Sequence, residues 1–528
     1  MNLESSALLL GDEAIALGAI HAGISGVYAY PGTPSTEITE YIQNSKEAQS
    51  VFSKWCVNEK TAMEAALGMS YVGKRALVCM KHVGMNVAAD AFVNSAVSGI
   101  NGGVVVLAAD DPSMHSSQNE QDSRFYGKFA MIPILEPSSQ QEAYDMMSYA
   151  FDLSEQLQEP IVLRITTRMA HSRAVVKVGA KVAQNEIHFP KDPRRWVLLP
   201  AIARRRYNEL VAQQAEQLSL SETTEYNRFV EGKDKSLGVV AAGIAWNYLN
   251  ENFPEGLPYS AVKVSQYPLP KALIARLVKE CDSVLVLEDG QPFIEEQLRG
   301  LLDEGNIIGR LNGALPRVGE LTPDNIKPAL GLKSQQCYEA LAEVVVARPP
   351  ALCQGCGHRD VYAALNKIVA EYEGAKVFSD IGCYTLGALP PFNTIDSTID
   401  MGASVTMAKG AADAGHHPSL AVIGDSTFTH SGMTGLLDAV NSNSRMTLII
   451  SDNLTTGMTG GQDSAGTNKF EAICIGLGVD PDHLKVVVPL PKNMAQIEAT
   501  LREEIEYDGL SVIIPRRECI QTLKRHKK

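Results

Sequence analysis

The feature that most constrains this 528-residue chain is the repeated alternation of short apolar runs with segments of helical length and period. Buried parallel strands read as nearly continuous apolar runs, and a parallel connection needs a crossover that is usually a helix. The clearest runs lie at Val27–Tyr30, Ala76–Cys79, Gly103–Ala109, Pro160–Ile165, Leu237–Ala242, Ser260–Ser265, Ser283–Glu288, Lys376–Asp380, Leu420–Gly424, Thr447–Ser451 and Ser511–Pro515. The alternation predicts an α/β protein whose parallel sheets are flanked by helices.

Two changes in this pattern divide the chain into three α/β domains. A polar, charged stretch over residues 174–235 predicts a linker of surface helices after a first domain at 1–173. A second domain at 236–346 fades into polar sequence, and a third occupies 347–528. Three domains is also the number suggested by a prior of roughly one per 150 residues.

Charge and composition exclude several classes of protein. The chain has 47 Lys and Arg against 61 Asp and Glu, which opposes attraction to phosphate backbones, so we expect no nucleic-acid partner. Apolar runs fall short of membrane-spanning length and the N-terminus carries no basic leader, so we expect no membrane association and a cytoplasmic location. The nine cysteines favour free thiols or metal ligation over a disulfide framework.

Polar residues follow two apolar runs of the third domain. Gly424 and Asp425 end the first run, and Asn453 comes 28 residues after Asp425, close behind the second. Mg²⁺ takes about six oxygen ligands and is usually held by one or two side chains with phosphates completing the shell. Asp425, Asn453 and a backbone carbonyl near Thr455 are therefore candidate ligands at the carboxyl edge of a parallel sheet. Each motif alone is an ordinary turn, but together they predict a site for Mg²⁺ and a diphosphate.

Two further features of this segment suit a diphosphate. Gly424 lets phosphates come close, and a helix starting near Ser431 would aim free N–H groups at them. The arrangement resembles the thiamine-diphosphate motif of the Gly-Asp-Gly…Asn-Asn type, with Ser426 in place of the third glycine. This replacement is tolerable if the φ angle of Ser426 is negative.

The first domain offers an acid for the other half of such a site. Thiamine chemistry needs orientation and a proton relay from the protein, and a glutamate facing the pyrimidine ring is the expected relay. Glu59 lies between Asn58 and Lys60, directly before a helical run from Thr61 to Tyr71. Taken alone, a glutamate such as Glu59 is more often an ordinary acid at a helix start or a surface residue.

Four cysteines of the third domain are candidate ligands of an iron–sulfur cluster, because thiolates hold such clusters in fours. Cys353 and Cys356 form a C-x-x-C, Cys383 follows an apolar run, and Cys519 lies near the end. A C-x-x-C is also found as a zinc half-site, as a redox pair or by coincidence, and the chain has no second one to strengthen zinc. The other five, expected mostly in the core, are Cys56, Cys79, Cys281, Cys337 and Cys474.

Several segments spread over nearly the whole chain carry a family resemblance. They are Tyr30–Ser35, Asn58–Lys60, Met80–Val87, Asp110–Pro112, Ser116–Arg124, Leu352–Arg359, Asp380–Gly387 and Gly424–Phe428. These segments resemble the α subunit of indolepyruvate:ferredoxin oxidoreductase, a thiamine-diphosphate-dependent 2-oxoacid oxidoreductase. Members of that family typically continue into a ferredoxin-like domain with two cysteine clusters, whereas this sequence ends at Lys528 without those cysteines.

The resemblance implies a role for each domain. It implies a pyrimidine-binding domain at 1–173, the helical linker at 174–235, a transketolase C-terminal-like domain at 236–346 and a diphosphate-binding domain at 347–528. Thiamine diphosphate would lie between the first and third domains, of one chain or of two. Glu59 would be the acid that faces the pyrimidine, and Thr33 would meet the substrate carboxylate.

The resemblance also implies ligands for the cofactors. The residues implied for thiamine diphosphate and Mg²⁺ are His358, Gly382, Thr385, Met401, Gly402, Ala403, Gly424, Asp425, Ser426, Asn453 and Thr455. Cys353, Cys356, Cys383 and Cys519 would hold a single [4Fe-4S] cluster beside the thiamine.

His82 and Arg124 are further candidates, each with two interpretations. His82 is either a hydrogen-bonded loop residue or, with the moderate burial expected there, a proton-transfer group whose pKa stays near its usual value. Arg124 either binds a carboxylate bidentately or pairs with neighbouring Asp122.

The resemblance finally implies a reaction and partners. We expect an aryl 2-oxo acid such as indolepyruvate, with coenzyme A, to give acyl-CoA and CO₂. Electrons would pass to ferredoxin or another electron-transfer subunit, and a smaller β-type subunit would complete a hetero-oligomer built on a dimer. The alternatives are a non-oxidative thiamine decarboxylase or ligase, if the cysteines hold no iron, and a cofactor-binding scaffold without its own chemistry.

Overall fold

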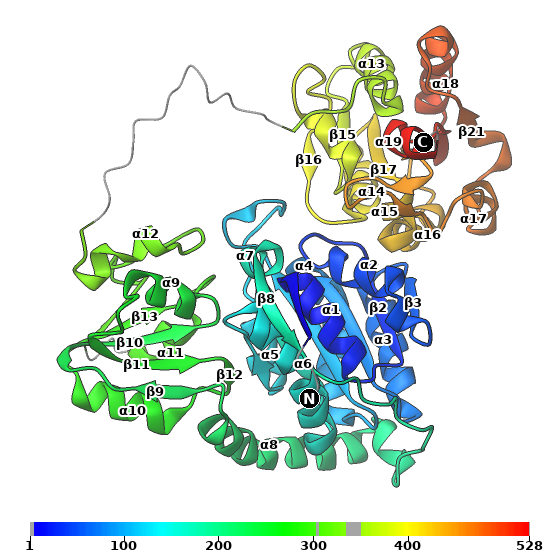
Figure 1. Cartoon of the computed structure of the whole chain (residues 1–528). Helices are drawn as coiled ribbons and strands as arrows, with labels where there is room; N and C mark the ends of the chain where they lie inside the picture. Colours follow the sequence, from blue (N-terminus) through cyan, green and yellow to red (C-terminus); the bar gives the residue numbers. More distant parts are fainter. Residues whose placement is uncertain (1–4, 302–305, 334–349, 527–528) are drawn as a thin grey trace. The chain divides into compact units, whose positions relative to one another are not determined.

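The computed structural model describes residues 5–301, 306–333 and 350–526. The chain divides into two compact units, Met1–Tyr338 and Glu339–Lys528, here called unit 1 and unit 2 (Figure 1). Cys337 and the predicted domain boundary at 346/347 lie outside the described residues. Within the described ranges, no helix is both long and apolar enough to cross a membrane.

Unit 1 is built on a seven-stranded sheet. Its order is β12 (Gln266–Tyr267), β6 (Ile134–Leu135), β7 (Ile161–Thr166), β5 (Val104–Asp110), β4 (Ala76–Lys81), β2 (Gly26–Ala29) and β3 (Phe52–Trp55). Every pairing in it is parallel except that of the edge strand β12. The central strand β5 is buried along its whole length, as its apolar run predicts.

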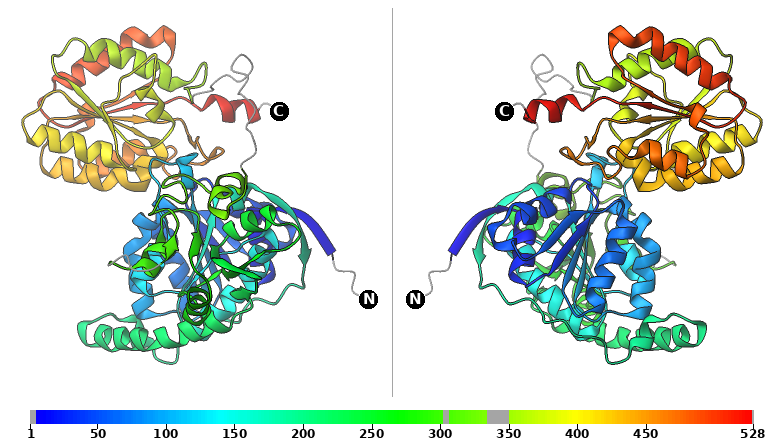
Figure 2. Two further views of the ribbon diagram at one scale, coloured as in Figure 1. Left: turned by 90° about the vertical axis from the view of Figure 1, so that its left-hand side faces the viewer. Right: turned by 90° about the vertical axis from the view of Figure 1, so that its right-hand side faces the viewer.

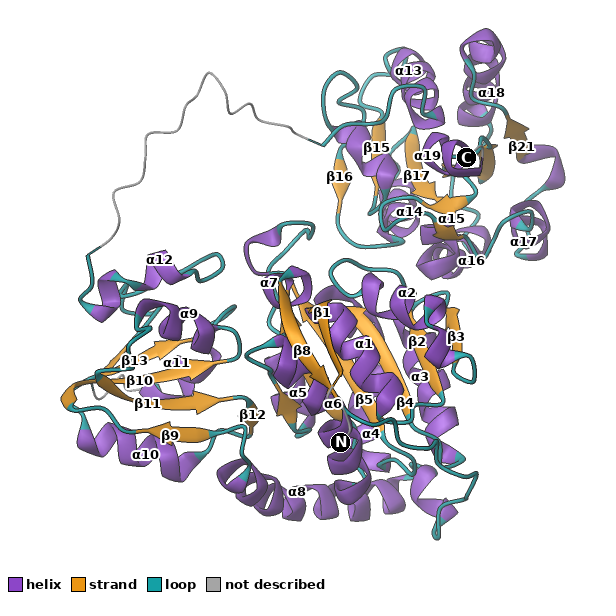
Figure 3. Ribbon diagram, viewed as in Figure 1, coloured by secondary structure: helices purple, strands orange, loops and turns teal. Residues whose placement is uncertain are grey.

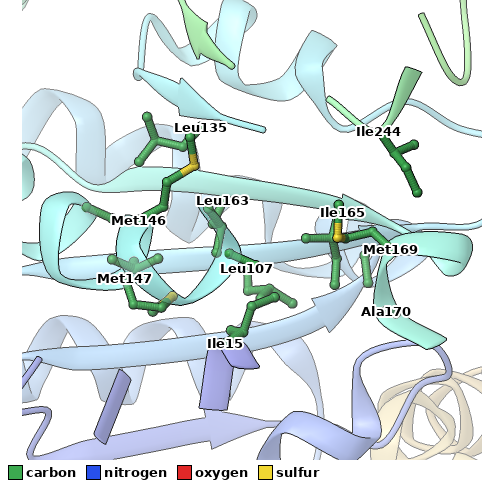
Figure 4. Packing of buried hydrophobic residues seen from close by; sticks show 14 of the residues in the cluster. Ile15, Leu107, Leu135, Met146, Met147, Leu163, Ile165, Met169, Ala170 and Ile244 are labelled. Atoms are coloured by element: carbon green, nitrogen blue, oxygen red, sulfur yellow. The ribbon is translucent and has the colours of Figure 1, made fainter. Parts of the chain in front are cut away.

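Helices cover both faces of this sheet. Alternate strand residues point to opposite sides, and in the buried strands the residues on both sides are apolar. The helices are α1 (Gly11–His21), α2 (Thr36–Asn44), α3 (Glu59–Tyr71), α4 (His82–Ser98), α5 (Arg124–Ala130), α6 (Gln140–Leu157) and α7 (Thr167–His171). Leu107 and Leu163 pack with Ile15 of α1 and Met147 of α6 on one face (Figure 4). Val106 and Ala108 face α3 and α4 on the other.

A five-stranded sheet belongs to the same unit. Its order is β14 (Ile307–Ile308), β13 (Val284–Leu287), β10 (Asp234–Ala242), β11 (Tyr259–Val264) and β9 (Arg228–Val230), with β9 antiparallel. Its helices are α9 (Ala245–Asn252), α10 (Lys271–Glu280), α11 (Phe293–Arg299) and α12 (Pro323–Ile326). Ile244, beside this sheet, belongs to the same apolar cluster as Leu107, so one core runs through both parts of unit 1 (Figure 4).

The predicted linker at 174–235 is only partly helical. Its one long helix among the described residues is α8 (Pro200–Thr223). Residues 174–178 belong instead to β8 (Arg173–Val178), which pairs antiparallel with β1 (Ser5–Leu10). The pairing partner lies more than 160 residues away, so local sequence gave little sign of this strand.

Unit 2 is built on a six-stranded sheet that is parallel throughout. Its order is β16 (Ser397–Thr398), β15 (Lys376–Ser379), β17 (Ser419–Gly424), β18 (Thr447–Ser451), β22 (Ser511–Pro515) and β21 (Leu484–Val487). A short antiparallel pair, β19 (Thr455–Thr456) and β20 (Gln462–Asp463), follows β18.

Helices again lie on both faces of this sheet (Figures 2 and 3). They are α13 (Gly357–Val369), α14 (Ala403–Asp413), α15 (Asp425–Thr427), α16 (Met433–Asn441), α17 (Phe470–Gly476), α18 (Met494–Glu506) and α19 (Ile520–His526). Val422 and Ile449 face α13 and α18, whereas Ile423 and Leu448 face α14, α16 and α17. The predicted α/β class with helix-flanked parallel sheets is confirmed.

Candidate active site

The two strand ends predicted to share a ligand site are neighbours in unit 2. In the parallel pair β17–β18, Gly424 lies opposite Ser451, so Asp425 and Asn453 emerge at the same edge of the sheet. The Thr455 backbone N–H lies 3.1 Å from Asp425 Oδ2 and 3.1 Å from Asn453 Oδ1. One amide therefore brings the carboxylate and amide oxygens together, as a shared Mg²⁺ would require.

Asp425 has a buried carboxyl group that forms no ion pair with a Lys or Arg among the described residues. Its side chain accepts hydrogen bonds from the Ser426 and Thr455 N–H groups, and within the described ranges no Lys or Arg forms an ion pair with it. Burial and the nearby Asp452 raise the pKa of Asp425 to about 7. A buried carboxylate in this condition fits a divalent cation, which would favour its ionised form.

The residues around Asp425 correct one detail of the sequence interpretation, the start of the helix. The helical segment begins at Asp425 itself, passes through a π-helical turn at Phe428–Gly432 and continues as α16, so it does not start near Ser431. Gly424 is required by packing: a Cβ atom there would lie 2.5 Å from the Tyr384 ring. Ser426 lies in α15 with helical geometry, so the negative φ it needs is present.

Asp380 organises a second part of this edge that the sequence interpretation did not single out. It follows β15 and accepts hydrogen bonds from the Gly402 N–H (3.1 Å), the Ser404 N–H (3.2 Å) and the Ser404 hydroxyl (2.6 Å). The Tyr384 hydroxyl also donates to it. Asp380 thus fixes the turn that carries Met401, Gly402 and Ala403.

The turn after β15 holds the other residues expected near the cofactor. The Thr385 hydroxyl donates to the Asp380 carbonyl (2.5 Å) and accepts from the Gly382 N–H (2.9 Å). Burial raises the pKa of Asp380 to about 6. An aspartate directly after a buried strand was the available sequence signal, the same signal that identified Asp425.

The four candidate cluster cysteines line one pocket of unit 2, together with His358 and Asn453. Cys353 is exposed and the other three are half-buried. Burial, followed by the proximity of the other three thiols, raises the pKa of Cys383 to about 12. Their sulfur atoms do not converge within 4.8 Å of one another as a single ion's ligands would, although one such group exists elsewhere in the described chain.

The thiol pocket and the Asp425–Asn453 edge share residues. The Cys519 N–H donates to the Asn453 carbonyl (3.0 Å), and Asn453 Nδ2 lies 3.4 Å from His358 Nε2. His358 is buried, and burial lowers its pKa to about 4, so it is neutral at pH 7. Of the remaining cysteines in the described residues, Cys79, Cys281 and Cys474 are buried as expected, and Cys56 is half-buried.

The first-domain candidates lie where β2, β3 and β4 of the seven-stranded sheet end. Thr33 is in the loop after β2, Glu59 is the first residue of α3, and His82 is the first residue of α4. Glu59 is 5% exposed, and its carboxylate packs so closely on Gly84 that a Cβ there would meet it at 2.8 Å. The Asn58 side chain caps α3 by accepting from the Thr61 N–H.

His82 differs from expectation because it is fully buried. Burial lowers its pKa, so the moderate burial and near-normal pKa expected from the sequence are wrong. Its Nε2 lies 3.2 Å from the Asn119 carbonyl, and its Nδ1 is buried without a hydrogen-bond partner in the structure. The neighbouring Lys81 connects two loops at this edge. It donates to the Ser116 carbonyl (3.0 Å) and packs on Gly32, beside Thr33.

Arg124 adopts the second of its two interpretations. It is fully buried, and its Nε donates to Asp122 Oδ1 (2.9 Å) while its Nη1 donates to Glu288 Oε2 (2.8 Å). Its Nη2 reaches Asp122 and the carbonyl oxygens of Asp289 and Gln291. No N–H group is left for a substrate, so Arg124 joins the two sheets of unit 1 and is not a catalytic candidate.

Comparisons with known proteins agree with this geometry. The family model described as "Pyruvate flavodoxin/ferredoxin oxidoreductase, thiamine diP-bdg" matches residues 17–227, and "Thiamine pyrophosphate enzyme, C-terminal TPP binding domain" matches 380–514. A solved structure of 2-oxoglutarate:ferredoxin oxidoreductase from Magnetococcus marinus shares the fold, with a TM-score of 0.50 and 16% identity over 58% of this chain and 62% of that one.

Curated relatives extend the match to almost the whole chain. Indolepyruvate oxidoreductase subunit IorA of Archaeoglobus fulgidus is 39% identical over 97% of this chain and 86% of its own length. The same subunit of Thermococcus kodakarensis is 37% identical over 97% and 85%. The 2-oxoglutarate synthase subunit KorA of Methanothermobacter marburgensis is 27% identical over 35% of this chain and 50% of its own. The chain therefore belongs to the IorA family of indolepyruvate oxidoreductase subunits and is an oxidoreductase catalytic subunit with thiamine-diphosphate-binding domains.

Proposed function

We propose that this chain catalyses the oxidative decarboxylation of an aryl 2-oxo acid, indolepyruvate or a similar arylpyruvate, with coenzyme A, to acyl-CoA and CO₂. The electrons leave through a [4Fe-4S] cluster to ferredoxin or another electron-transfer subunit. A smaller β-type subunit completes the enzyme, as the word "subunit" in the relatives' names suggests. The aryl substrate rests on those same names.

The observation that carries this proposal is the shared use of Asn453. Its side chain faces the Thr455 amide beside Asp425, and its backbone carbonyl holds Cys519 of the thiol pocket. A redox centre next to a thiamine site is what an oxidative reaction needs and a non-oxidative one does not. Four cysteines line this pocket, and thiolates hold iron–sulfur clusters in fours.

The residues of each unit have distinct proposed roles. Asp425, Asn453 and the Thr455 carbonyl would hold Mg²⁺ and, through it, the diphosphate. Gly382, Thr385, Met401, Gly402 and Ala403 would line the rest of the cofactor on the frame that Asp380 fixes. When bound, thiamine diphosphate supplies a nucleophilic carbon and an electron sink.

In unit 1, Glu59 would hold the proton that the pyrimidine exchanges, because its carboxylate is buried at a helix start and fixed against Gly84. Thr33 would donate to the substrate carboxylate. His82 is neutral at pH 7 and accepts or donates one proton through a fixed ring, so it would orient substrate by a hydrogen bond.

The test is iron, acid-labile sulfide and the visible spectrum of the full chain purified without oxygen, alone and with its β-type partner. One cysteine-ligated cubane gives about four irons per chain. Cys383→Ser should lose the iron, and Cys56→Ser, a half-buried cysteine outside the pocket, should keep it. Absence of iron in both preparations would reject the oxidative reaction in favour of non-oxidative thiamine chemistry.

A further inference from the structure

Three side chains with metal-binding chemistry, none of them assigned a role above, meet in unit 1. They are Asp12 in the first turn of α1, Glu37 in the first turn of α2, and His171 at the end of α7. One ligand atom from each lies within 4.8 Å of the other two. His171 Nε2 is 4.0 Å from Asp12 Oδ2 and 3.8 Å from Glu37 Oε1.

These distances do not describe hydrogen bonds, because a side-chain hydrogen bond of this kind spans about 2.7–3.2 Å. They suit three ligands of one ion. With metal–ligand distances near 2.1 Å, the ligand atoms of a tetrahedral site lie roughly 3 to 4 Å apart.

The second observation is the state of Asp12. Its side chain is fully buried, yet neither carboxylate oxygen has a hydrogen-bond partner in the structure. Glu37 Oε2 is likewise buried without a partner. Burial, with Glu37 and Glu13 nearby, raises the pKa of Asp12 well above its usual value. Buried carboxylates are normally hydrogen-bonded or bound to a cation. The Asp12 carboxylate has no hydrogen-bond partner, and a bound cation would supply what is missing.

The helix dipole accounts for only part of this arrangement. Acids in the first turn of α1 and α2 are favourable at any helix N-terminus. That preference is satisfied equally well by an exposed acid, such as one facing water. It gives no reason for Asp12 to be fully buried with both oxygens unpartnered and facing an imidazole.

The geometry points to a binding site for one divalent transition-metal cation, held by Asp12, Glu37 and His171. Two carboxylates and one imidazole suit Zn²⁺ or a neighbouring first-row ion, with solvent completing the shell. The His171 and Glu37 side chains are 37% and 41% exposed, so an ion can enter from the surface. The bound ion would tie α1, α2 and α7 together and would brace α2, which begins three residues after Thr33.

The first test is the amount of Zn²⁺ retained by the metal-stripped full chain after gel filtration. Wild type should retain one equivalent more than Asp12→Asn and one more than His171→Ala, whatever the thiols of unit 2 bind. Glu40→Gln, on α2 but outside the cluster, is the matched control and should equal wild type. Equal retention by wild type and Asp12→Asn would overturn the proposal.

Thermal unfolding with and without Zn²⁺ separates a metal ligand from a structural acid. Without metal, Asp12→Asn should melt at or above the wild-type temperature, because it removes a buried carboxyl group that has no hydrogen-bond partner. With Zn²⁺, wild type should gain thermal stability and Asp12→Asn should not, since only a bound ion stabilises by mass action. A metal-free Asp12→Asn that melts well below wild type, or an equal Zn²⁺ effect on both, would contradict the site.

Discussion

The buried carboxylates around Asp122 in unit 1 and around Asp425 in unit 2 have opposite kinds of partner. In unit 1, Asp122 contacts the guanidinium groups of both Arg124 and Arg164, all three side chains being fully buried. In unit 2, Asp425 and Asp380 are buried among N–H and O–H donors, and neither forms an ion pair with a Lys or Arg of the described chain.

The pKa of Asp122 shows how nearby cations can offset burial. The two guanidinium groups hold the pKa of Asp122 below its usual value despite burial. Glu288, whose carboxylate forms an ion pair with Arg124, has its pKa raised by burial to about 7, and burial also raises the pKa of Asp425 to about 7. The Asp122 network of unit 1 therefore completes its charge balance within the chain, whereas Asp425 of unit 2 would be balanced by a bound cation, as the proposed Mg²⁺ site requires.

The largest expected effect is the loss of cofactor binding in Asp425→Ala. Because Asp425 is the proposed charged ligand, its removal should abolish thiamine-diphosphate binding in the presence of Mg²⁺, measured by titration calorimetry, and with it activity. Asp463→Asn, an exposed acid of the same unit, should bind normally. Normal binding by Asp425→Ala would disprove both the Mg²⁺ site and the contrast between the units.

The next largest effect is on the folding of unit 1. Arg164 donates to Asp110 (2.6 Å) and to Glu136, and its removal as Arg164→Met leaves both acids buried without that cation. Breaking a buried pair from one side costs about 3–5 kcal/mol. Denaturant unfolding of the full chain measures it, and Arg168→Met, whose pair with Glu320 is partly exposed, should cost at most about 1 kcal/mol. Equal losses in the free energy of unfolding of the two variants would mean that burial does not determine the cost of removing the arginine.

Glu159 tests whether nearby positive charges, or the unit in which a buried carboxyl group lies, determine its pKa. It lies in unit 1 but is buried with only the Gln217 amide as hydrogen-bond partner, and burial raises its pKa to about 8. The folded chain then keeps a proton that the unfolded chain loses near pH 4.5, so this residue's contribution to stability falls as the pH rises from about 4.5 to about 8.

Glu159→Gln cannot lose that proton, so its advantage over wild type should grow with pH. Taking about 1.4 kcal/mol per unit and half of the shift, the gain is on the order of 2 kcal/mol between pH 5 and pH 8. Thermal unfolding across that range measures it. A constant difference between the two proteins would show that Glu159 is ionised in the folded state.

The sequence revealed the backbone of both units better than their charge networks. The runs at Leu420–Gly424 and Thr447–Ser451 became β17 and β18 because a strand buried on both faces must be apolar throughout. The same reasoning brought Asp425 and Asn453 to one sheet edge. The hydrogen-bond partner of a buried polar side chain does not follow from local sequence. Arg124 contacts Glu288, 164 residues away, and Tyr384 reaches Asp380 only because of the turn between them.

The smallest expected effect separates the contribution of burial from that of the number of contacts in an ion pair. Arg516 in unit 2 donates to Asp452 (2.6 Å) and to both Glu471 oxygens (2.8 Å each), a richer set of contacts than many buried pairs have. The Arg516 side chain is nevertheless 24% exposed, although Asp452 is fully buried, so water can enter where the guanidinium is removed and limit the cost to Asp452. Arg516→Gln should therefore cost only about 1 kcal/mol in denaturant unfolding, and Arg502→Gln, at a fully surface pair with Glu371, close to nothing. A loss for Arg516→Gln as large as that for Arg164→Met would show that the number of contacts, rather than burial, sets the energy, and the contrast between the two units would then rest on Asp425 alone.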